Sequence, residues 1–162
     1  MGRGATFPPC YNRPMKYAMA TSLLIGSLLA PGAVQAGSGW IERANGAPLQ
    51  LVGHCDSRSS RWEGGGIYSY CEVSVLRIVH GEPSQTLVVR QRGGEVDGIA
   101  QKVTHVSLME PGRSYLLFLA PDASGSWSPT SKGLYAVVDS PAGQTVGGEA
   151  LDEVIRALGG AS

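Results

Sequence analysis

The sequence predicts a mainly β protein, a small antiparallel barrel or sandwich of about six strands with one helix near the C-terminus. Short segments rich in Val, Leu, Ile and Tyr recur along the chain after residue 48. Segments containing Gly, Pro, Ser and Asp separate them at short intervals, which is typical of turns between strands. The last apolar segment alone changes from the strand period of two to the helical period of 3.6.

The N-terminal segment predicts export. Met15 and Lys16 precede an apolar run over residues 17–30, and residues 33–36 provide a cleavage site with small side chains at its two critical positions. The run is short for a bilayer span, which needs about 20 residues. We therefore expect residues 1–36 to be an N-terminal extension and a cleavable signal peptide, with an uncleaved anchor as the alternative. The mature chain would then be periplasmic or secreted.

Cleavage after Ala36 leaves residues 37–162, the length of one domain. This part has 13 acidic and 10 basic residues, a net charge of −3. A mildly acidic chain with scattered arginines predicts no nucleic-acid partner. It also contains no basic amphipathic helix that would indicate a membrane surface.

Cys55 and Cys71 remain after cleavage removes Cys10, and an oxidising compartment favours closing such a pair. The alternative is a reactive or metal-binding thiol pair, but the separation of 16 fits neither a redox Cys-x-x-Cys nor a zinc cluster. Both cysteines fall on the apolar phase of their strands. Antiparallel pairing across Gly64–Gly66 would let the sulfurs face each other, so we expect a structural disulfide.

The strands of the expected domain, residues 48–162, follow a lead-in segment at 37–47. The long strand 67–79 changes its apolar phase at Val75 and Leu76, which predicts a β-bulge. The uninterrupted apolar segment 115–120 predicts a central strand covered on both faces. The other predicted strands are 48–55, 85–91, a weak one at 103–108, and 134–138. Residues 56–66 are expected to form a polar loop or hairpin tip, and residues 93–98 and 121–132 are expected to form loops.

The C-terminal segment 149–158 predicts a helix. Leu151, Val154, Ile155 and Leu158 recur at the spacing of one helix face. We expect this helix to pack on the barrel or to close one end of it.

Motifs with a known chemistry are missing from the sequence. It has no nucleophile elbow, zinc-protease motif, phosphate loop or dinucleotide fingerprint. We therefore expect no catalytic, cofactor-binding or metal-binding residues and no cofactor. His54, His80 and His105 are isolated in sequence; a site assembled in three dimensions around one of them is the alternative. Residues 95–98 lack the ligand spacing of a calcium loop and predict a solvated turn.

Three tryptophans, Trp40, Trp62 and Trp127, lie in the lead-in and in predicted loops. Exposed aromatic side chains near one end of a barrel would form a binding surface for a carbohydrate or a protein. The alternative is that each tryptophan covers the barrel core.

Several motifs carry a resemblance to known proteins: Ile67-Tyr68-Ser69, His80-Gly81, Gly93-Gly94, and the segment Gly112-Arg113-Ser114-Tyr115-Leu116-Leu117-Phe118-Leu119. Over about residues 49–145 the chain resembles a group of uncharacterised bacterial exported β-rich proteins. Their pattern is Ile-Tyr-Thr, Lys-Gly, Gly-Gly and Gly-x-x-Tyr-Leu-Leu-Phe-Leu. Ser69 stands here for the Thr, and His80 stands for the Lys. The resemblance implies a fold and no activity.

More distantly, the order of strands and glycines is similar to the OB-like barrel of netrin and metalloprotease-inhibitor domains. The N-terminal cysteine that carries inhibition in those inhibitors has no counterpart at Gly37. The resemblance therefore implies an OB-like barrel without the inhibitory residue.

These observations favour a non-enzymatic exported binding or accessory domain. Its expected partner is another exported protein or a cell-surface polymer. A small exported hydrolase and a protease inhibitor-like domain are the alternatives.

Overall fold

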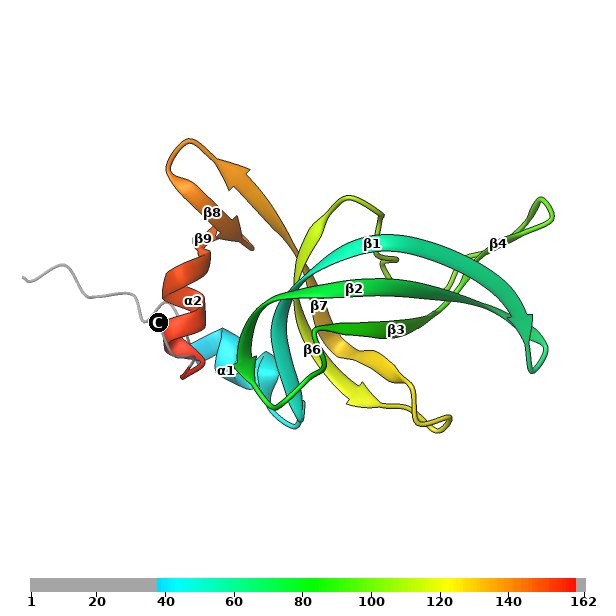
Figure 1. The fold of residues 1–162 in the computed structure, drawn as a ribbon, viewed down its shortest axis with the longest axis horizontal. Helices are drawn as coiled ribbons and strands as arrows, with labels where there is room; N and C mark the ends of the chain where they lie inside the picture. The colour runs from blue at the N-terminus through cyan, green and yellow to red at the C-terminus, as the bar shows by residue number, and fades with distance from the viewer. Residues whose placement is uncertain (1–37, 160–162) are drawn as a thin grey trace, which may run out of the picture. The chain divides into compact units, whose positions relative to one another are not determined.

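The computed structural model describes residues 38–159, so the predicted signal peptide and extension, residues 1–36, lie outside the described residues. Two short helices and nine strands follow one another along this range (Figure 1). In chain order they are α1 (Ser38–Ala44), β1 (Leu49–Glu63), β2 (Gly66–His80), β3 (Thr86–Arg92), β4 (Gly94–Val96), β5 (Ile99–Gln101), β6 (Ser114–Pro121), β7 (Trp127–Ser140), β8 (Gly143–Val146), β9 (Glu149–Ala150) and α2 (Leu151–Ala157). Among these residues no helix is long and apolar enough to span a bilayer.

Five strands close into a ring. β1 pairs antiparallel with β2 and β6, β2 pairs with β3, and β6 pairs with β7. A parallel contact between β3 and β7, at Val89 and Trp127, completes the circuit. The predicted mainly β fold is therefore confirmed, and of its two forms the structure is the barrel. β8 and β9 continue the sheet from β7, whereas β4 and β5 form a separate hairpin that projects from the ring (Figure 1).

The interior of the ring is filled by alternate residues of its strands, as the period of two requires. Leu51 and Leu117 face inward from β1 and β6, and Val73 and Val89 do so from β2 and β3. Met109, from the segment between β5 and β6, is fully buried among them. This side chain closes part of the barrel that no strand covers.

A second core lies on the other face of β6. Leu116 and Phe118 alternate with the inward residues and pack, fully buried, with side chains of α2 and with Trp40 of α1. The prediction of a central strand covered on both faces is thus confirmed. The helix predicted at 149–158 is also confirmed as α2, whose buried residues are Leu151, Val154 and Ile155.

The segment expected as a lead-in contains helix α1. Trp40 is 1% exposed and its Nε1 donates a hydrogen bond to Glu149 Oε1 at 2.9 Å. Its ring meets Tyr135 edge-on, with the centroids 4.8 Å apart. Trp40 and Ala44 share one face of the helix, an apolar pattern too short to be recognised in the sequence.

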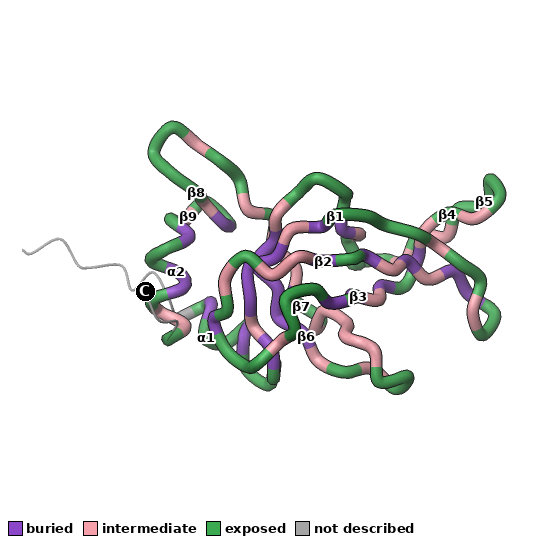
Figure 2. Tube along the Cα trace, in the orientation of Figure 1, coloured by how far each residue is buried: buried purple, intermediate pink, exposed green. Residues whose placement is uncertain are grey.

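The β1–β2 hairpin is longer than predicted, because β1 continues through residues 56–63, which were expected to form a polar loop or the tip of a hairpin. Beyond Cys55 the strand has left the barrel, and most of its residues on both faces are exposed (Figure 2). Residues 56–63 are polar because both faces of this part of the strand contact solvent. Hydrogen bonding to β2 keeps the segment extended. The predicted bulge is confirmed: Val52 faces Arg77 while Gly53 faces Val75, so Leu76 has no residue opposite it in β1.

The predicted disulfide is confirmed. Cys55 and Cys71 are joined across β1 and β2, with their Cα atoms 6.1 Å apart. Cys55 lies opposite Val73 and Cys71 opposite Arg58, so the bond runs diagonally across the hairpin beside another irregularity of the pairing, at Asp56. The bond holds together the two strands where they leave the barrel.

Three further predictions are wrong. Residues 103–108 form no strand. Gln91 binds this segment through Ser107 O and Met109 N, and the side chain of Met109 enters the barrel core. The expected loop 93–98 instead contains β4 and the turn to β5, made by Asp97 and Gly98, which both have positive φ. An Asp-Gly pair of this kind is a strong hairpin signal. The expected loop 121–132 ends early, since β7 begins at Trp127.

Candidate functional site

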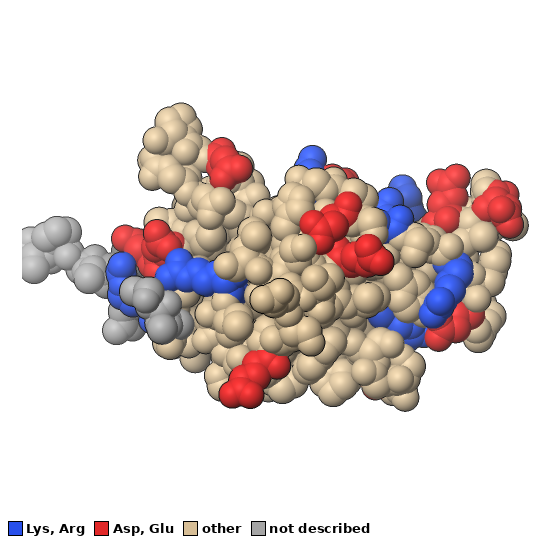
Figure 3. Space-filling model, in the orientation of Figure 1, with Lys and Arg blue, Asp and Glu red and all other residues tan. Residues whose placement is uncertain are grey.

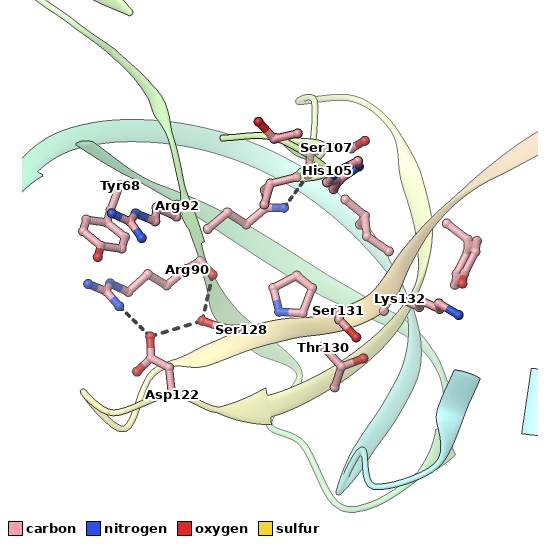
Figure 4. Close-up of a pocket in the computed structure, with 17 residues that line it drawn as sticks. Tyr68, Arg90, Arg92, His105, Ser107, Asp122, Ser128, Thr130, Ser131 and Lys132 are labelled. Atoms are coloured by element: carbon pink, nitrogen blue, oxygen red, sulfur yellow. Dashed lines mark hydrogen bonds and ion pairs between the residues drawn. The ribbon is translucent and has the colours of Figure 1, made fainter. Parts of the chain in front are cut away.

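A cleft of about 660 Å³ lies where β3 and β7 separate after their contact at Val89 and Trp127. It is bordered by β3, by β7, by Tyr68 of β2 and by residues 104–107 (Figure 4). Tyr68, Arg90 and Arg92 lie along one side, and Thr130, Ser131 and Lys132 lie along the other (Figure 4). The cleft therefore opens at the one place where the ring of strands is closed by a single residue pair.

An irregularity in β7 forms one side of the cleft. Leu117 faces Leu134 and Leu119 faces Pro129, so residues 130–133 together occupy the space opposite Phe118. Gly133 makes this possible, because a Cβ there would collide with the backbone oxygen of Phe118 and lie 2.7 Å from the Thr130 nitrogen. The bulge therefore depends on a residue without a side chain.

Replacing Gly133 by alanine is expected to lower the free energy of unfolding by about 1–3 kcal/mol, the usual cost of overpacking. Urea denaturation followed by circular dichroism measures it. Gly39→Ala is the matched control, because a Cβ added at Gly39 would meet no atom within 4 Å and alanine favours a helix. Equal stability of the two variants would contradict the close approach at Gly133.

Arg90 lies on the side of the cleft that β3 forms, and it makes several bonds there. Its Nη1 donates to Asp122 Oδ2 at 2.6 Å, its Nη2 to Glu63 Oε1 at 3.0 Å and its Nε to the Tyr70 hydroxyl at 3.2 Å. The guanidinium lies 3.7 Å from the ring centroid of Tyr68. Tyr70 in turn donates to Glu63, and this bond, with the charge of Arg90, lowers the pKa of Glu63. Arg90 thereby joins the hairpin end of β1 to β3 and to the β6–β7 turn.

Asp122 is saturated with donors. Ser124 donates from its backbone nitrogen at 2.8 Å and from its hydroxyl at 2.6 Å, and the Ser126 nitrogen donates at 3.1 Å. Arg90 donates to Oδ2, and the Ser128 hydroxyl shares its one proton between Oδ2 at 3.2 Å and the Arg90 carbonyl oxygen at 2.9 Å. The Ser124 hydrogen bond, followed by that of Arg90, outweighs burial and holds the pKa of Asp122 far below its ordinary value. Such a carboxylate stays charged and is a poor proton acceptor.

The lowered pKa of Asp122 predicts a specific pH dependence. Its contribution to stability is complete above the unfolded pKa of about 3.9 and is lost as the pH falls toward the lower native pKa. We expect Asp122→Asn to flatten the fall in unfolding free energy between about pH 4 and pH 2.5, by up to about 1.4 kcal/mol per pH unit. Urea denaturation at stepped pH measures the slope.

Asp97→Asn is the control for this experiment. It makes the same change of charge in an exposed turn, where asparagine tolerates the positive φ of 52°. Parallel pH slopes for the wild type and Asp122→Asn would contradict the assigned role of Asp122.

The other cations of the cleft are not engaged in this way. The side chains of Arg92 and Lys132 are exposed, and within residues 38–159 neither makes a hydrogen bond or an ion pair. The lining thus has three guanidinium or ammonium groups against the single carboxylate of Asp122. Elsewhere, Figure 3 shows acidic and basic side chains interspersed at both ends of the visible face. The lining of the cleft is therefore basic, although the chain as a whole has no net positive charge.

Serine and threonine hydroxyl groups complete the lining. They belong to Thr104, Ser107, Ser128, Thr130 and Ser131. Among the described residues, Thr130 Oγ1 is the buried side-chain atom without a hydrogen-bond partner. Gln91 fixes the segment over the opening, since its Nε2 donates to Ser107 O at 2.8 Å and its Oε1 accepts from Met109 N at 2.9 Å.

No protein-family model and no curated protein matches this chain. Its function has to be inferred from the chemistry of the cleft.

The tryptophans do not form one surface. Trp40 is buried in the second core, which excludes it from any exposed binding surface. Trp127 begins β7 and packs, partly buried, against the barrel interior. Trp62 alone of the three is largely exposed, at 51%, near the end of β1. The alternative that tryptophans cover the core therefore describes Trp40 and Trp127.

The histidines lie on three different elements. His54 shares a 3.2 Å hydrogen bond with Ser114 between β1 and β6, and His80 ends β2 beside α1. His105 lines the cleft and has a positive φ of 65°. Within the described residues no group of three or more His, Cys, Asp and Glu could hold a metal ion.

Sequence reasoning missed the residues that form the cleft. One signal was present: Tyr68, Tyr70, Arg90 and Arg92 occupy alternate positions of two strands whose other positions are mostly apolar. That alternation identifies the outer face of the sheet, but it does not show that β7 and residues 104–107 lie across from it.

Proposed function

We propose that the protein is an exported, non-enzymatic binding domain whose cleft between β3 and β7 holds part of its partner. The partner is another exported protein or a cell-surface polymer. The observation that carries this proposal is the lining of the cleft. The lining combines hydroxyls with cations that have no partner in residues 38–159, and its one carboxylate already accepts several hydrogen bonds. Concave sites with a few convergent polar groups are the usual places for ligands.

The state of the ionisable groups supports a binding role over a hydrolase. A general base needs to accept a proton at neutral pH and needs a partner that orients it. Asp122 has a strongly lowered pKa and its carboxylate oxygens already accept several hydrogen bonds. Within residues 38–159 no hydrogen bond orients the ring of His105.

Export is supported by the disulfide between Cys55 and Cys71, since such bonds persist in oxidising compartments. The N-terminal sequence is the second support. The OB-like resemblance remains part of the proposal; a closed ring of five strands is compatible with it.

A blocked cleft tests the proposal. Ser131 is exposed on the cleft side of β7, and Ser131→Trp would fill part of the space without touching a core. We expect the immobilised wild-type protein to retain a component of the exported fraction of its source. Ser131→Trp should retain it at least about tenfold less, because binding energy concentrates in well-filled contacts.

Ser84→Trp is the matched control, because Ser84 is equally exposed but lies in the turn before β3, outside the cleft. It should retain as much as the wild type. Equal retention by all three proteins would place binding elsewhere. Turnover of an ester, peptide or glycoside substrate that Ser131→Trp abolishes would replace the binding role with an enzymatic one.

A further inference from the structure

We propose that the ligand of the cleft is an acidic polysaccharide, whose carboxylates lie between Arg92 and Lys132. This inference rests on the proposed binding function and specifies the class of its ligand. It starts from the charge of the lining. Arg90 is neutralised by Asp122 and Glu63, whereas Arg92 and Lys132 have no partner among the described residues.

The positions of these two cations favour a ligand that spans the cleft. Arg92 is the last residue of β3 and Lys132 lies in the bulge of β7, so they are on opposite sides of the opening (Figure 4). A polymer with regularly spaced anions can meet both of them at once. Both side chains are exposed, so a polymer can reach them from solvent.

The hydroxyl groups favour a carbohydrate. Serine and threonine hydroxyls both donate and accept hydrogen bonds, as sugar hydroxyls do. Thr130 lies on the β7 side of the cleft, and its own Oγ1 is buried there without a hydrogen-bond partner in the described part of the chain. Ser131, beside it, is exposed on the same side of the cleft.

Tyr68 adds a flat surface. Its ring is stacked with the guanidinium of Arg90 at 3.7 Å, and Arg90 is itself held by Asp122 and Glu63. The stack is therefore fixed before any ligand arrives, which reduces the entropy lost on binding. Amphipathic rings of this kind suit the mixed apolar and polar faces of sugars.

Two other polyanions fit the same charge less well. An acidic peptide would be expected to use the free edges of β3 and β7 as an added strand, but Ser128 already donates to the Arg90 carbonyl across that gap at 2.9 Å. A nucleic acid would be expected to use a longer basic stripe. The lining here contains three permanent cations, one of which is already paired.

Binding to defined polymers tests the inference. Polygalacturonate is the acidic polysaccharide, dextran is the neutral one, and polyglutamate and a thymidine oligonucleotide are the competing polyanions. Titration calorimetry of the purified protein should show binding of polygalacturonate, with no binding of dextran and binding of the other polyanions at least about tenfold weaker. Raising the salt to about 0.5 M should weaken binding, because exposed charges are screened.

The variant Arg92→Glu/Lys132→Glu should raise the dissociation constant for polygalacturonate at least about tenfold, since it reverses both charges. Arg156→Glu/Lys102→Glu makes the same net change at exposed positions outside the lining and should leave the constant unchanged. Stronger binding of polyglutamate or of the oligonucleotide would overturn the inference in favour of that class.

The two proposals fail differently. Dextran binding that Ser131→Trp blocks but Arg92→Glu/Lys132→Glu leaves unchanged would keep the cleft as a binding site and overturn its preference for acidic ligands. If Ser131→Trp changes the binding of no polymer and of no component of the exported fraction, the binding function of the cleft itself is overturned.

Discussion

Replacing Trp40 by alanine is expected to lower the free energy of unfolding by about 3–5 kcal/mol, the usual loss for a large buried aromatic residue. Trp40 is 1% exposed and belongs to the core between the barrel and α2. The substitution also removes the donor to Glu149 and the edge-on contact with Tyr135. Urea denaturation followed by circular dichroism measures the change.

Ile41→Ala is a stringent control for this prediction. Ile41 is the next residue in α1, but it is 56% exposed, so its truncation should change stability by no more than about 0.5 kcal/mol. Trp40→Phe would isolate the hydrogen bond to Glu149 and should lose less than Trp40→Ala. If Trp40→Ala costs no more than Ile41→Ala, then α1 is not an integral part of the domain.

The sequence predicts those parts of the fold in which the local pattern of apolar residues matches the pattern of buried side chains. β6 is apolar at nearly every position because its odd residues fill the barrel and its even residues meet the helices. The change of phase at Val75 and Leu76 predicts the bulge because a shift of one residue moves every later side chain to the other face. Both cysteines fall on the apolar face of their strands, the one directed into the barrel, and this shared position predicts the disulfide between them.

Prediction fails where the environment is set by distant residues. The outer half of β1 is polar because it extends beyond the barrel, and no local pattern separates such a strand from a loop. Residues 103–108 alternate like a strand, but Met109 and Gln91 tie that segment across the opening. The cleft brings together parts of β3 and β7 that are about 40 residues apart in sequence, so the spacing of residues could not reveal it.

Breaking the disulfide is the other change expected to have a large effect. The double variant Cys55→Ala/Cys71→Ala should lose about 3 kcal/mol of unfolding free energy, the value for a closed loop of about 15 residues. In the chain-entropy account the loss arises because the unfolded chain gains freedom. Both cysteines are also buried in the barrel core, so the removal of two sulfur atoms adds a packing loss.

Reduction separates these two contributions. The wild-type protein in dithiothreitol keeps both sulfur atoms and should lose the part that comes from the covalent bond alone. The double variant serves as the control, because the reductant should leave its stability unchanged. Full stability of the reduced wild type would contradict the structural role of the bond.

The same bond should also affect the cleft. Cys55 and Cys71 tie β1 to β2 where the β1–β2 hairpin leaves the barrel. The part of the hairpin beyond the bond, residues 57–70, contains Glu63 and Tyr70, which both bind Arg90. Reduction is therefore expected to increase amide hydrogen exchange first in residues 57–70, because paired strands outside a core have few other contacts to resist opening. Unchanged exchange there, with faster exchange in β6, would show that the bond supports the barrel and leaves the hairpin unaffected.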